Sequence, residues 1–174
     1  PAATARPARP VAGAAPAPQS IFPFTVTDSN GNEVTFDRPP ERIVAYDSAA
    51  VEILFAMGEG QRVVATHSFV TYPPEVADIP KVGDAFEMNV EAVVALDPDL
   101  VFVFFPTFLE KLENVGLKVL FIETLSHDFT RIGDTIEMWG RITGNPSAAA
   151  GLAAEFSSRV ERIRGVMAAQ PDGP

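Results

Sequence analysis

The chain has 174 residues, of which 47% are hydrophobic, and its formal net charge is −10. This length and composition suit one folded domain with a substantial core. The absence of cysteine excludes disulfides, thiolate metal sites and cysteine nucleophiles, the acidic charge disfavours nucleic-acid binding, and no apolar run approaches the roughly 20 residues of a membrane span.

The first 20 residues differ in composition from the rest of the chain. They contain five prolines and eight alanines, with few side chains that a core could bury. This composition predicts a flexible or partly extended linker over residues 1–20. A tether between a membrane anchor and a folded domain is one functional version of such a linker.

The next segment, residues 24–36, predicts a β-hairpin. Val26 and Val34 flank the pair Asn30-Gly31, and both residues of this pair tolerate the positive φ angles of a tight turn. Apolar residues continue the alternation on both sides of the turn, and the following prolines end the pattern.

From residue 42 onward, short apolar runs alternate with helical patterns. The apolar runs predict buried strands, and apolar residues spaced three or four apart predict helices. The predicted strands cover residues 42–46, 62–66, 99–105 and 118–122. The predicted helices cover residues 48–58, 89–96, 108–116, 128–143 and 146–167. This alternation predicts an α/β fold, with a four-stranded parallel sheet flanked by helices, an N-terminal β-hairpin and a long C-terminal helix.

Ligands of such sheets bind beyond the carboxyl ends of the strands. Four loops begin at these ends, and they start at Asp47, His67, Pro106 and Thr124. These loops define the region in which we look for site residues.

Three candidate ligand contacts lie at the end of the first strand of the sheet. Tyr46 offers either a stacking surface and a hydroxyl to a ligand or a cap to the core. Asp47 offers either an acceptor to a ligand or an N-cap to the next helix, and Ser48 can also cap that helix. Both interpretations stay open at this stage.

Further candidates follow the second and third strands. His67 is either a ligand contact, including an iron ligand in haem, or an ordinary loop histidine. Phe105 belongs to the core or reaches the rim of a cleft, and Thr107 follows it in the loop. His67 and His127 lack the spacing of a metal site, so we predict no metal and no cofactor.

Several motifs in fixed order resemble the substrate-binding proteins of ABC importers for iron-siderophores, haem and cobalamin. "YPPE" occupies Tyr72–Glu75, and Asn-x-Glu at 89–91 is followed by "ALDPDLV" at 95–101. "GDTIEMWGRITGNPSAAAGLAAEF" at 133–156 is similar to the region that leads into the connecting helix of this family. The resemblance covers about residues 24–168.

The resemblance implies two Rossmann-like lobes joined by one long helix, with the ligand held between the lobes. On this basis residues 21–145 are the N-terminal lobe, residues 146–174 are the connecting helix and tail, and the second lobe is absent from the sequence. It also implies an extracytoplasmic protein that binds a ferric siderophore or a related iron or tetrapyrrole complex, with Phe86 near the cleft rim. A half-cleft should bind such a ligand weakly, because it buries less of the ligand surface than a closed cleft.

Glu91 gains a role from the same resemblance, which implies that it docks on arginines of the importer's membrane subunits. A carboxylate in the first turn of a helix is favoured by the helix dipole by about 0.3–1 kcal/mol. Arginine can bind such a carboxylate through two hydrogen bonds. The alternative is that Glu91 serves only its own helix terminus.

Two further functions are compatible with the architecture. A small α/β enzyme would need a nucleophile or a phosphate loop at a strand end, but "AYDSAA" around Ser48 lacks the G-x-S-x-G elbow and no P-loop is present. We therefore predict no catalytic residue. The helix at 146–167 carries an apolar stripe without its partner lobe, which predicts a homodimer formed through this helix.

Overall fold

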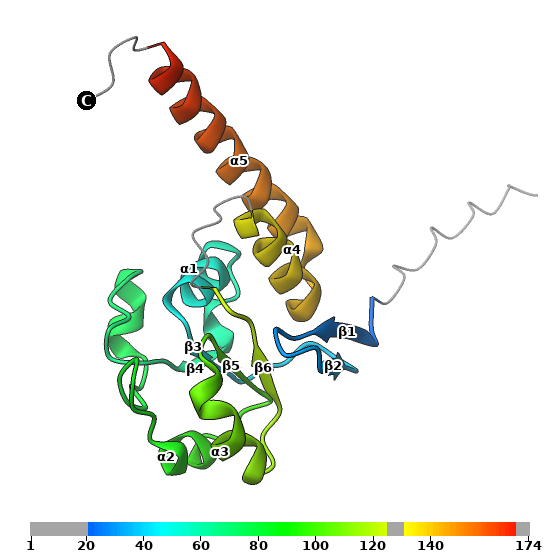
Figure 1. Ribbon diagram of the computed structural model, residues 1–174, viewed down its shortest axis with the longest axis vertical. Helices are drawn as coiled ribbons and strands as arrows, with labels where there is room; N and C mark the ends of the chain where they lie inside the picture. The colour runs from blue at the N-terminus through cyan, green and yellow to red at the C-terminus, as the bar shows by residue number, and fades with distance from the viewer. Residues whose placement is uncertain (1–20, 125–130, 170–174) are drawn as a thin grey trace, which may run out of the picture.

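The computed structural model describes residues 21–124 and 131–169 of the chain (Figure 1). The predicted linker at residues 1–20 lies outside the described residues. The same holds for residues 125–130, which include His127 and the predicted start of the fourth helix, and for the tail at residues 170–174.

The chain alternates strands and helices as the sequence predicts. The strands are β1 (Phe24–Thr27), β2 (Glu33–Phe36), β3 (Ile43–Tyr46), β4 (Val63–Ala65), β5 (Leu100–Val103) and β6 (Val119–Phe121). The α-helices are α1 (Ser48–Ala56), α2 (Val90–Ala95), α3 (Leu109–Asn114), α4 (Ile132–Thr143) and α5 (Pro146–Ala168). Short 3₁₀ helices are η1 (Gly60–Arg62), η2 (Pro74–Asp78) and η3 (Pro106–Phe108).

The main sheet is parallel, and its four strands lie in the order β4-β3-β5-β6. The prediction of a four-stranded parallel sheet is therefore confirmed. The chain passes from β3 to β4 on one side and then returns to place β5 on the other side of β3. This reversal creates a topological switch point at the carboxyl ends of β3 and β5, where ligands of open α/β sheets bind.

The sheet separates two apolar cores, because neighbouring residues of a strand point to opposite faces. On β3, Ile43 and Ala45 pack on one face with α1, α4 and the hairpin. Val44 and Tyr46 pack on the other face with side chains of α2 and α3. All four residues of β3 are buried, so helices cover both faces of the sheet.

The hairpin forms as predicted, with β1 and β2 antiparallel and Phe24 opposite Phe36. Gly31 has a φ of 85° in the turn, a conformation that glycine adopts without strain. The guanidinium of Arg141 on α4 lies 4.0 Å from the centre of the Phe24 ring. This cation–π contact helps to hold the hairpin against α4.

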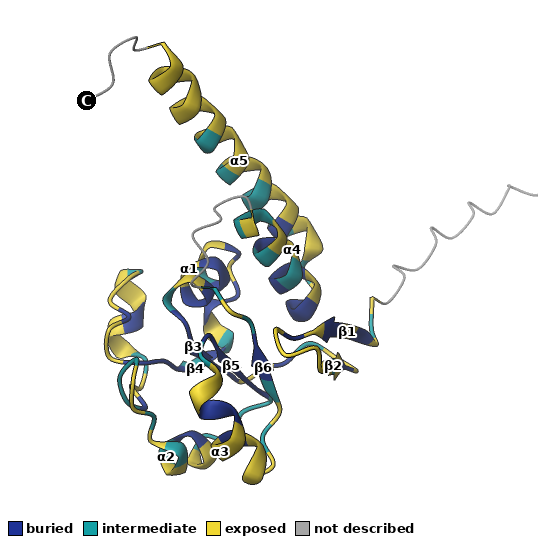
Figure 2. Cartoon of the chain, in the orientation of Figure 1, coloured by how far each residue is buried: buried dark blue, intermediate teal, exposed yellow. Residues whose placement is uncertain are grey.

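The long helix α5 begins against α4 and then extends away from the sheet (Figure 1). Gly144 has a φ of 76° and ends α4, and the side chain of Asn145 caps α5. Figure 2 shows that the C-terminal part of α5 is exposed, and every residue from 161 to 169 falls in this class. No helix in the described part of the chain is both long enough and apolar enough to cross a membrane.

Candidate ligand-binding site

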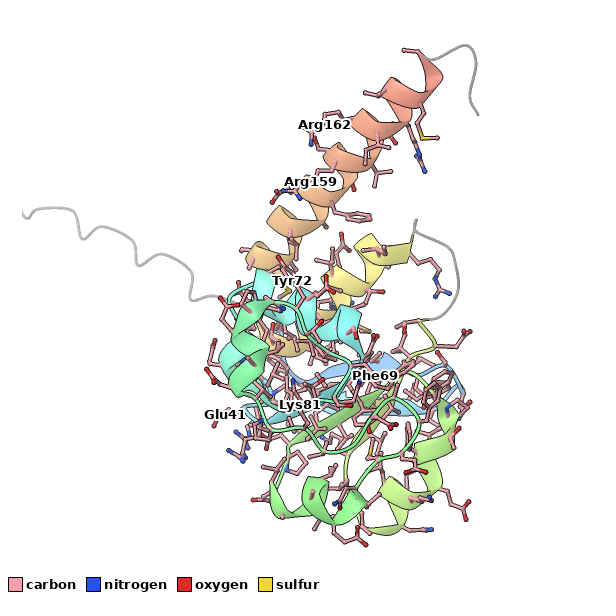
Figure 3. All side chains as sticks on the ribbon, turned by 90° about the vertical axis from the view of Figure 1, so that its left-hand side faces the viewer. Glu41, Phe69, Tyr72, Lys81, Arg159 and Arg162 are labelled. Carbon is pink, nitrogen blue, oxygen red and sulfur yellow. The ribbon has the colours of Figure 1, made fainter. Side chains whose placement is uncertain are left out.

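A series of ring contacts crosses the carboxyl edge of the sheet. The ring centroids are 6.4 Å apart for Phe86 and Phe69, 6.1 Å for Phe69 and His67, 6.2 Å for His67 and Phe104, and 4.4 Å for Phe104 and Phe105. We call these five side chains the aromatic row. The aromatic row joins three segments of the chain. Figure 3 labels one of its members, Phe69.

Two rings of the aromatic row are open to solvent. Phe86 is 73% exposed and Phe69 is 58% exposed, and the two rings meet edge to face at an interplanar angle of 69°. Large exposed aromatic rings in mutual contact offer apolar faces on which a ligand can stack. The sequence predicted Phe86 in the site and the loop that carries Phe69, but it did not single out the ring of Phe69.

The turn that carries Phe86 is held by Asp84. The carboxylate of Asp84 accepts from the backbone N–H groups of Phe86 at 2.8 Å and Glu87 at 2.9 Å. These two hydrogen bonds lower the pKa of Asp84 below its usual value, and the carboxylate therefore stays ionised. Gly83 has a φ of 125°, and an added Cβ would lie 2.1 Å from the carbonyl oxygen of Glu87. Only glycine fits at this position.

Tyr46 lies beneath this turn with no exposed surface. Its hydroxyl donates to the carbonyl oxygen of Asp84 and lies 2.9 Å from the carbonyl oxygen of Glu87. Burial, with a smaller contribution from the charge of Asp84, raises the pKa of Tyr46 to about 12, so the phenol stays protonated. In this conformation Tyr46 supports the loop that carries Phe86, and its ring does not face solvent.

Asp47 is the N-cap of α1, in agreement with one of the two interpretations of the sequence. Its Oδ1 atom accepts from the N–H of Ala49 at 3.0 Å, and its Oδ2 atom is buried without a hydrogen bond of ordinary geometry. Burial raises the pKa of Asp47, the Ala49 N–H and the Thr124 hydroxyl lower it, and the charge of Glu52 raises it. Ser48 is the first helical residue and is half-buried.

His67 is a buried member of the aromatic row and is 4% exposed. Its Nδ1 atom accepts from the backbone N–H of Phe69 at 3.3 Å, and its ring centroid is 5.3 Å from that of Tyr46. Burial lowers the pKa of His67, the charge of Lys81 lowers it further, and the charge of Asp84 opposes these effects. Among the described residues, no group of three or more His, Cys, Asp or Glu side chains is placed to hold a metal ion.

Two loops border the aromatic row. Phe105 is half-buried and Thr107 is exposed, both after β5. The second loop follows β4, and in it Lys81 donates from Nζ to the carbonyl oxygens of Val70 at 3.3 Å and Val76 at 2.9 Å. These bonds hold the segment that carries the exposed Tyr72, which Figure 3 labels together with Lys81.

A separate cleft of about 1180 Å³ lies beside the predicted loops. It is bounded by the hairpin turn, the outer side of α1, and the facing sides of α4 and α5. Tyr72, Pro106 and Thr124 reach it from the carboxyl-end loops, but none of the candidate residues from the sequence lines it. The search of the loops could not find this cleft, because residues of the hairpin, α1, α4 and α5 form most of its walls.

Glu91 is exposed in the first turn of α2. The side chain of Asn89 caps this helix by accepting from the N–H of Ala92 at 2.9 Å, so the helix terminus is satisfied without Glu91. The carboxylate of Glu91 makes no salt bridge among the described residues. It is therefore free to bind a cationic partner.

Comparisons with known proteins identify the family. Residues 43–174 match the model of the periplasmic binding protein family. The chain is 32% identical over 150 residues to YvrC, an uncharacterized ABC transporter substrate-binding lipoprotein of Bacillus subtilis. This match covers 83% of this chain and 47% of that protein. The chain is also 35% identical over 152 residues to a cobalamin-binding protein of Halobacterium salinarum, and this second match covers 82% of this chain and 40% of that protein.

The solved structures agree in fold. The ABC-type Fe³⁺-hydroxamate transport system of Saccharomonospora viridis superposes with a TM-score of 0.67 at 31% identity, over 82% of this chain and 56% of that chain. The chain spans less than half the length of the two curated relatives above. The matched family is one of binding proteins, so the comparisons do not favour a small α/β enzyme. By the extent of these matches, the chain belongs to the periplasmic binding protein family.

Proposed function

We propose that this chain is the ligand-capturing lobe of an extracytoplasmic substrate-binding component of an ABC importer. Its ligand is a ferric siderophore or a tetrapyrrole such as haem or cobalamin. The observation that carries the proposal is the exposed contact between Phe69 and Phe86 at the carboxyl edge of the sheet. The names of the relatives, which include a cobalamin-binding protein and a Fe³⁺-hydroxamate transport system, support this ligand class.

The geometry suits capture of a large ligand rather than its chemical conversion. Phe69 and Phe86 present apolar faces, while Tyr46 and Asp84 hold the supporting loop from below. Preorganised rings lose little conformational freedom when a ligand stacks on them. A single lobe covers only one side of a ligand, so we expect weaker binding than in an enclosed pocket.

The proposal is tested by titrating the chain with haemin, cyanocobalamin and ferrioxamine B in a calorimeter. We expect at least one probe to bind, and we expect the double variant Phe69→Ala/Phe86→Ala to weaken binding about tenfold or more, because truncation of a central aromatic anchor typically costs over 1 kcal/mol. Val115→Ala is the control, since Val115 is an exposed apolar residue at the end of α3. Equal affinity of the double variant and the wild type would contradict the proposal.

Glu91 is proposed to dock the lobe on arginines of the importer's membrane subunits. Its exposure, its lack of a salt bridge in the described chain and the separate cap from Asn89 support this role. An exposed carboxylate binds arginine with defined geometry through paired hydrogen bonds. Docking would therefore add orientation as well as attraction.

Self-association through α5 is proposed as a second property of this chain. Ile163, Val166 and Met167 are large apolar residues on α5, and each is more than half exposed. A second copy of α5 could cover them, because exposed apolar surface favours association. Light scattering at increasing protein concentration tests this, and a monomer at all concentrations would rule it out.

A further inference from the structure

We propose that His67 is a positioning residue that holds the Phe69 ring beside Phe86, and that protonation of His67 releases this ring. The inference rests on the proposed function, because it concerns control of the same ligand-binding surface. It assigns His67 a role that acts through Phe69 and does not require contact with the ligand.

The packing around His67 argues against direct ligand contact. The imidazole is 4% exposed and lies between Tyr46, at a centroid distance of 5.3 Å, and Phe104, at 6.2 Å. The ring of Phe69 stands almost perpendicular to it, at an interplanar angle of 86° and a centroid distance of 6.1 Å. His67 therefore forms the base on which the exposed ring of Phe69 rests.

The hydrogen bond between these residues depends on the protonation state of His67. The backbone N–H of Phe69 donates to Nδ1 of His67 over 3.3 Å. A backbone N–H can only donate, so Nδ1 must carry a lone pair and the neutral ring holds its proton on Nε2. An imidazolium carries protons on both nitrogens. Protonation therefore turns this hydrogen bond into a contact between two donors.

The rest of the turn explains why the effect falls on Phe69. Ser68 donates its N–H to the carbonyl oxygen of Gly83 at 2.9 Å, and Val70 donates to the carbonyl oxygen of His67 at 3.1 Å. Both neighbours of Phe69 are thus held by backbone bonds that do not titrate. The N–H of Phe69 is held by the imidazole, and its side chain is 58% exposed and can move into solvent.

The charged and titratable groups that act on the imidazole set the pH range of the release. Lys81 disfavours the imidazolium and Asp84 favours it, while Tyr46 stays protonated because its pKa is about 12. Burial and Lys81 together lower the pKa of His67 below its usual value. The bond to Phe69 is therefore intact at neutral pH, and the ring is released in the acidic range.

Two variants separate the hydrogen bond from the charge. His67→Asn keeps an oxygen that can accept from the N–H two residues later, as in an Asx-turn, and it does not titrate. His67→Leu replaces the imidazole by an apolar side chain, which cannot accept a hydrogen bond from the N–H of Phe69. Circular dichroism and the fluorescence of the buried Trp139 verify that each variant is folded.

The first measurement needs no ligand. In ¹H–¹⁵N NMR spectra of the wild type recorded from neutral to acidic pH, the Phe69 amide should shift with the same midpoint as the His67 imidazole. Nuclear Overhauser contacts between the Phe69 and Phe86 rings should be lost below that midpoint. In His67→Asn the Phe69 amide should not shift over this pH range, and the Overhauser contacts between the two rings should remain at acidic pH. A wild-type Phe69 amide that does not follow the His67 titration would overturn the inference.

The second measurement uses cyanocobalamin and haemin as probes. Below the midpoint, wild-type affinity should fall about fivefold or more, as expected for loss of a contact of hot-spot size. His67→Asn should bind equally at both pH values, and His67→Leu should bind weakly at both. A probe that binds the wild type equally at both pH values refutes the role of His67 and leaves the proposed function intact. If the Phe69 amide follows the His67 titration but no probe binds at either pH, the role of His67 stands and the proposed function is contradicted instead.

Discussion

The side-chain amide of Asn145 donates a 2.9 Å hydrogen bond to Oε1 of Glu59, and thereby ties the start of α5 to the turn after α1. Glu59 is buried, and its Oε2 atom accepts from Nε of Arg62 at 2.6 Å. Asn145 also caps α5 by accepting from the N–H of Ala148. The carboxylate of Glu59 therefore helps to fix the start of the long helix, together with the packing of α5 on α4.

Replacing Glu59 should destabilise the protein. Glu59→Ala leaves Nε of Arg62 and the side-chain amide of Asn145 without their acceptor, although Nη1 of Arg62 keeps the carbonyl oxygen of Pro40. Both donors are partly buried, and a donor that loses its partner away from water costs about 1–3 kcal/mol. Urea denaturation measures the free energy of unfolding. Glu155→Ala is the control, because the Glu155–Arg159 pair is exposed and such pairs contribute about 0–1 kcal/mol. Equal losses in both variants would contradict this account.

The crossing of α4 and α5 requires glycine at position 140. A Cβ added to Gly140 would lie 2.2 Å from the Cβ of Ala149, so Gly140→Ala forces the two helices apart. Such overpacking costs about 1–3 kcal/mol of stability. Gly151→Ala has open space around the new Cβ and should stabilise the helix by about 0.5–1 kcal/mol. Thermal unfolding of the two variants should therefore shift in opposite directions.

The buried carboxyl of Asp47 should make stability depend on pH. Its pKa is raised in the folded state, mainly by burial, so folding favours the protonated form. The native state is therefore penalised as the pH rises above the ordinary value of 3.8. Asp47→Asn keeps the acceptor for the Ala49 N–H and removes the charge.

This variant should be more stable than the wild type at pH 7. The difference should shrink as the pH falls and be smallest below 3.8, where Asp47 is protonated in both the folded and unfolded states. Denaturant unfolding at several pH values measures the difference. A difference in the free energy of unfolding that does not change with pH would show that the charge of Asp47 does not destabilise the folded state.

Reversal of the charge at Glu91 should disturb docking and spare ligand capture. Glu91→Arg places a cation opposite the arginines proposed on the membrane subunits, so stimulation of ATP hydrolysis by the reconstituted importer should fall strongly. The affinity for the ligand should not change. Glu110→Arg is the matched control, because Glu110 lies in the first turn of α3 and is also exposed. Equal loss in both variants would point to a general charge effect.

Local sequence patterns were sufficient to predict most of the elements. The buried run of β3, the turn at Asn30-Gly31 and the long helix after Pro146 were all predicted, and the structure confirms them. These features depend on residue periodicity and backbone preferences over a few neighbouring positions. The cap by Asp47 could also be anticipated, because a capping side chain acts within its own turn.

The sequence by itself determined the alternation of strands and helices, the loops at the carboxyl ends of the strands and the place of Glu91 in the first turn of a helix. Only the tertiary structure decided that Phe69 meets Phe86, that Tyr46 and His67 support these rings from below, and that Glu59 receives Asn145. These pairings depend on strand order and on how loops pack after the chain closes. Periodicity within a segment carries no information about which distant segment lies beside it. For that reason the loops of the proposed site could be located from the sequence, but the contacts between their side chains could not.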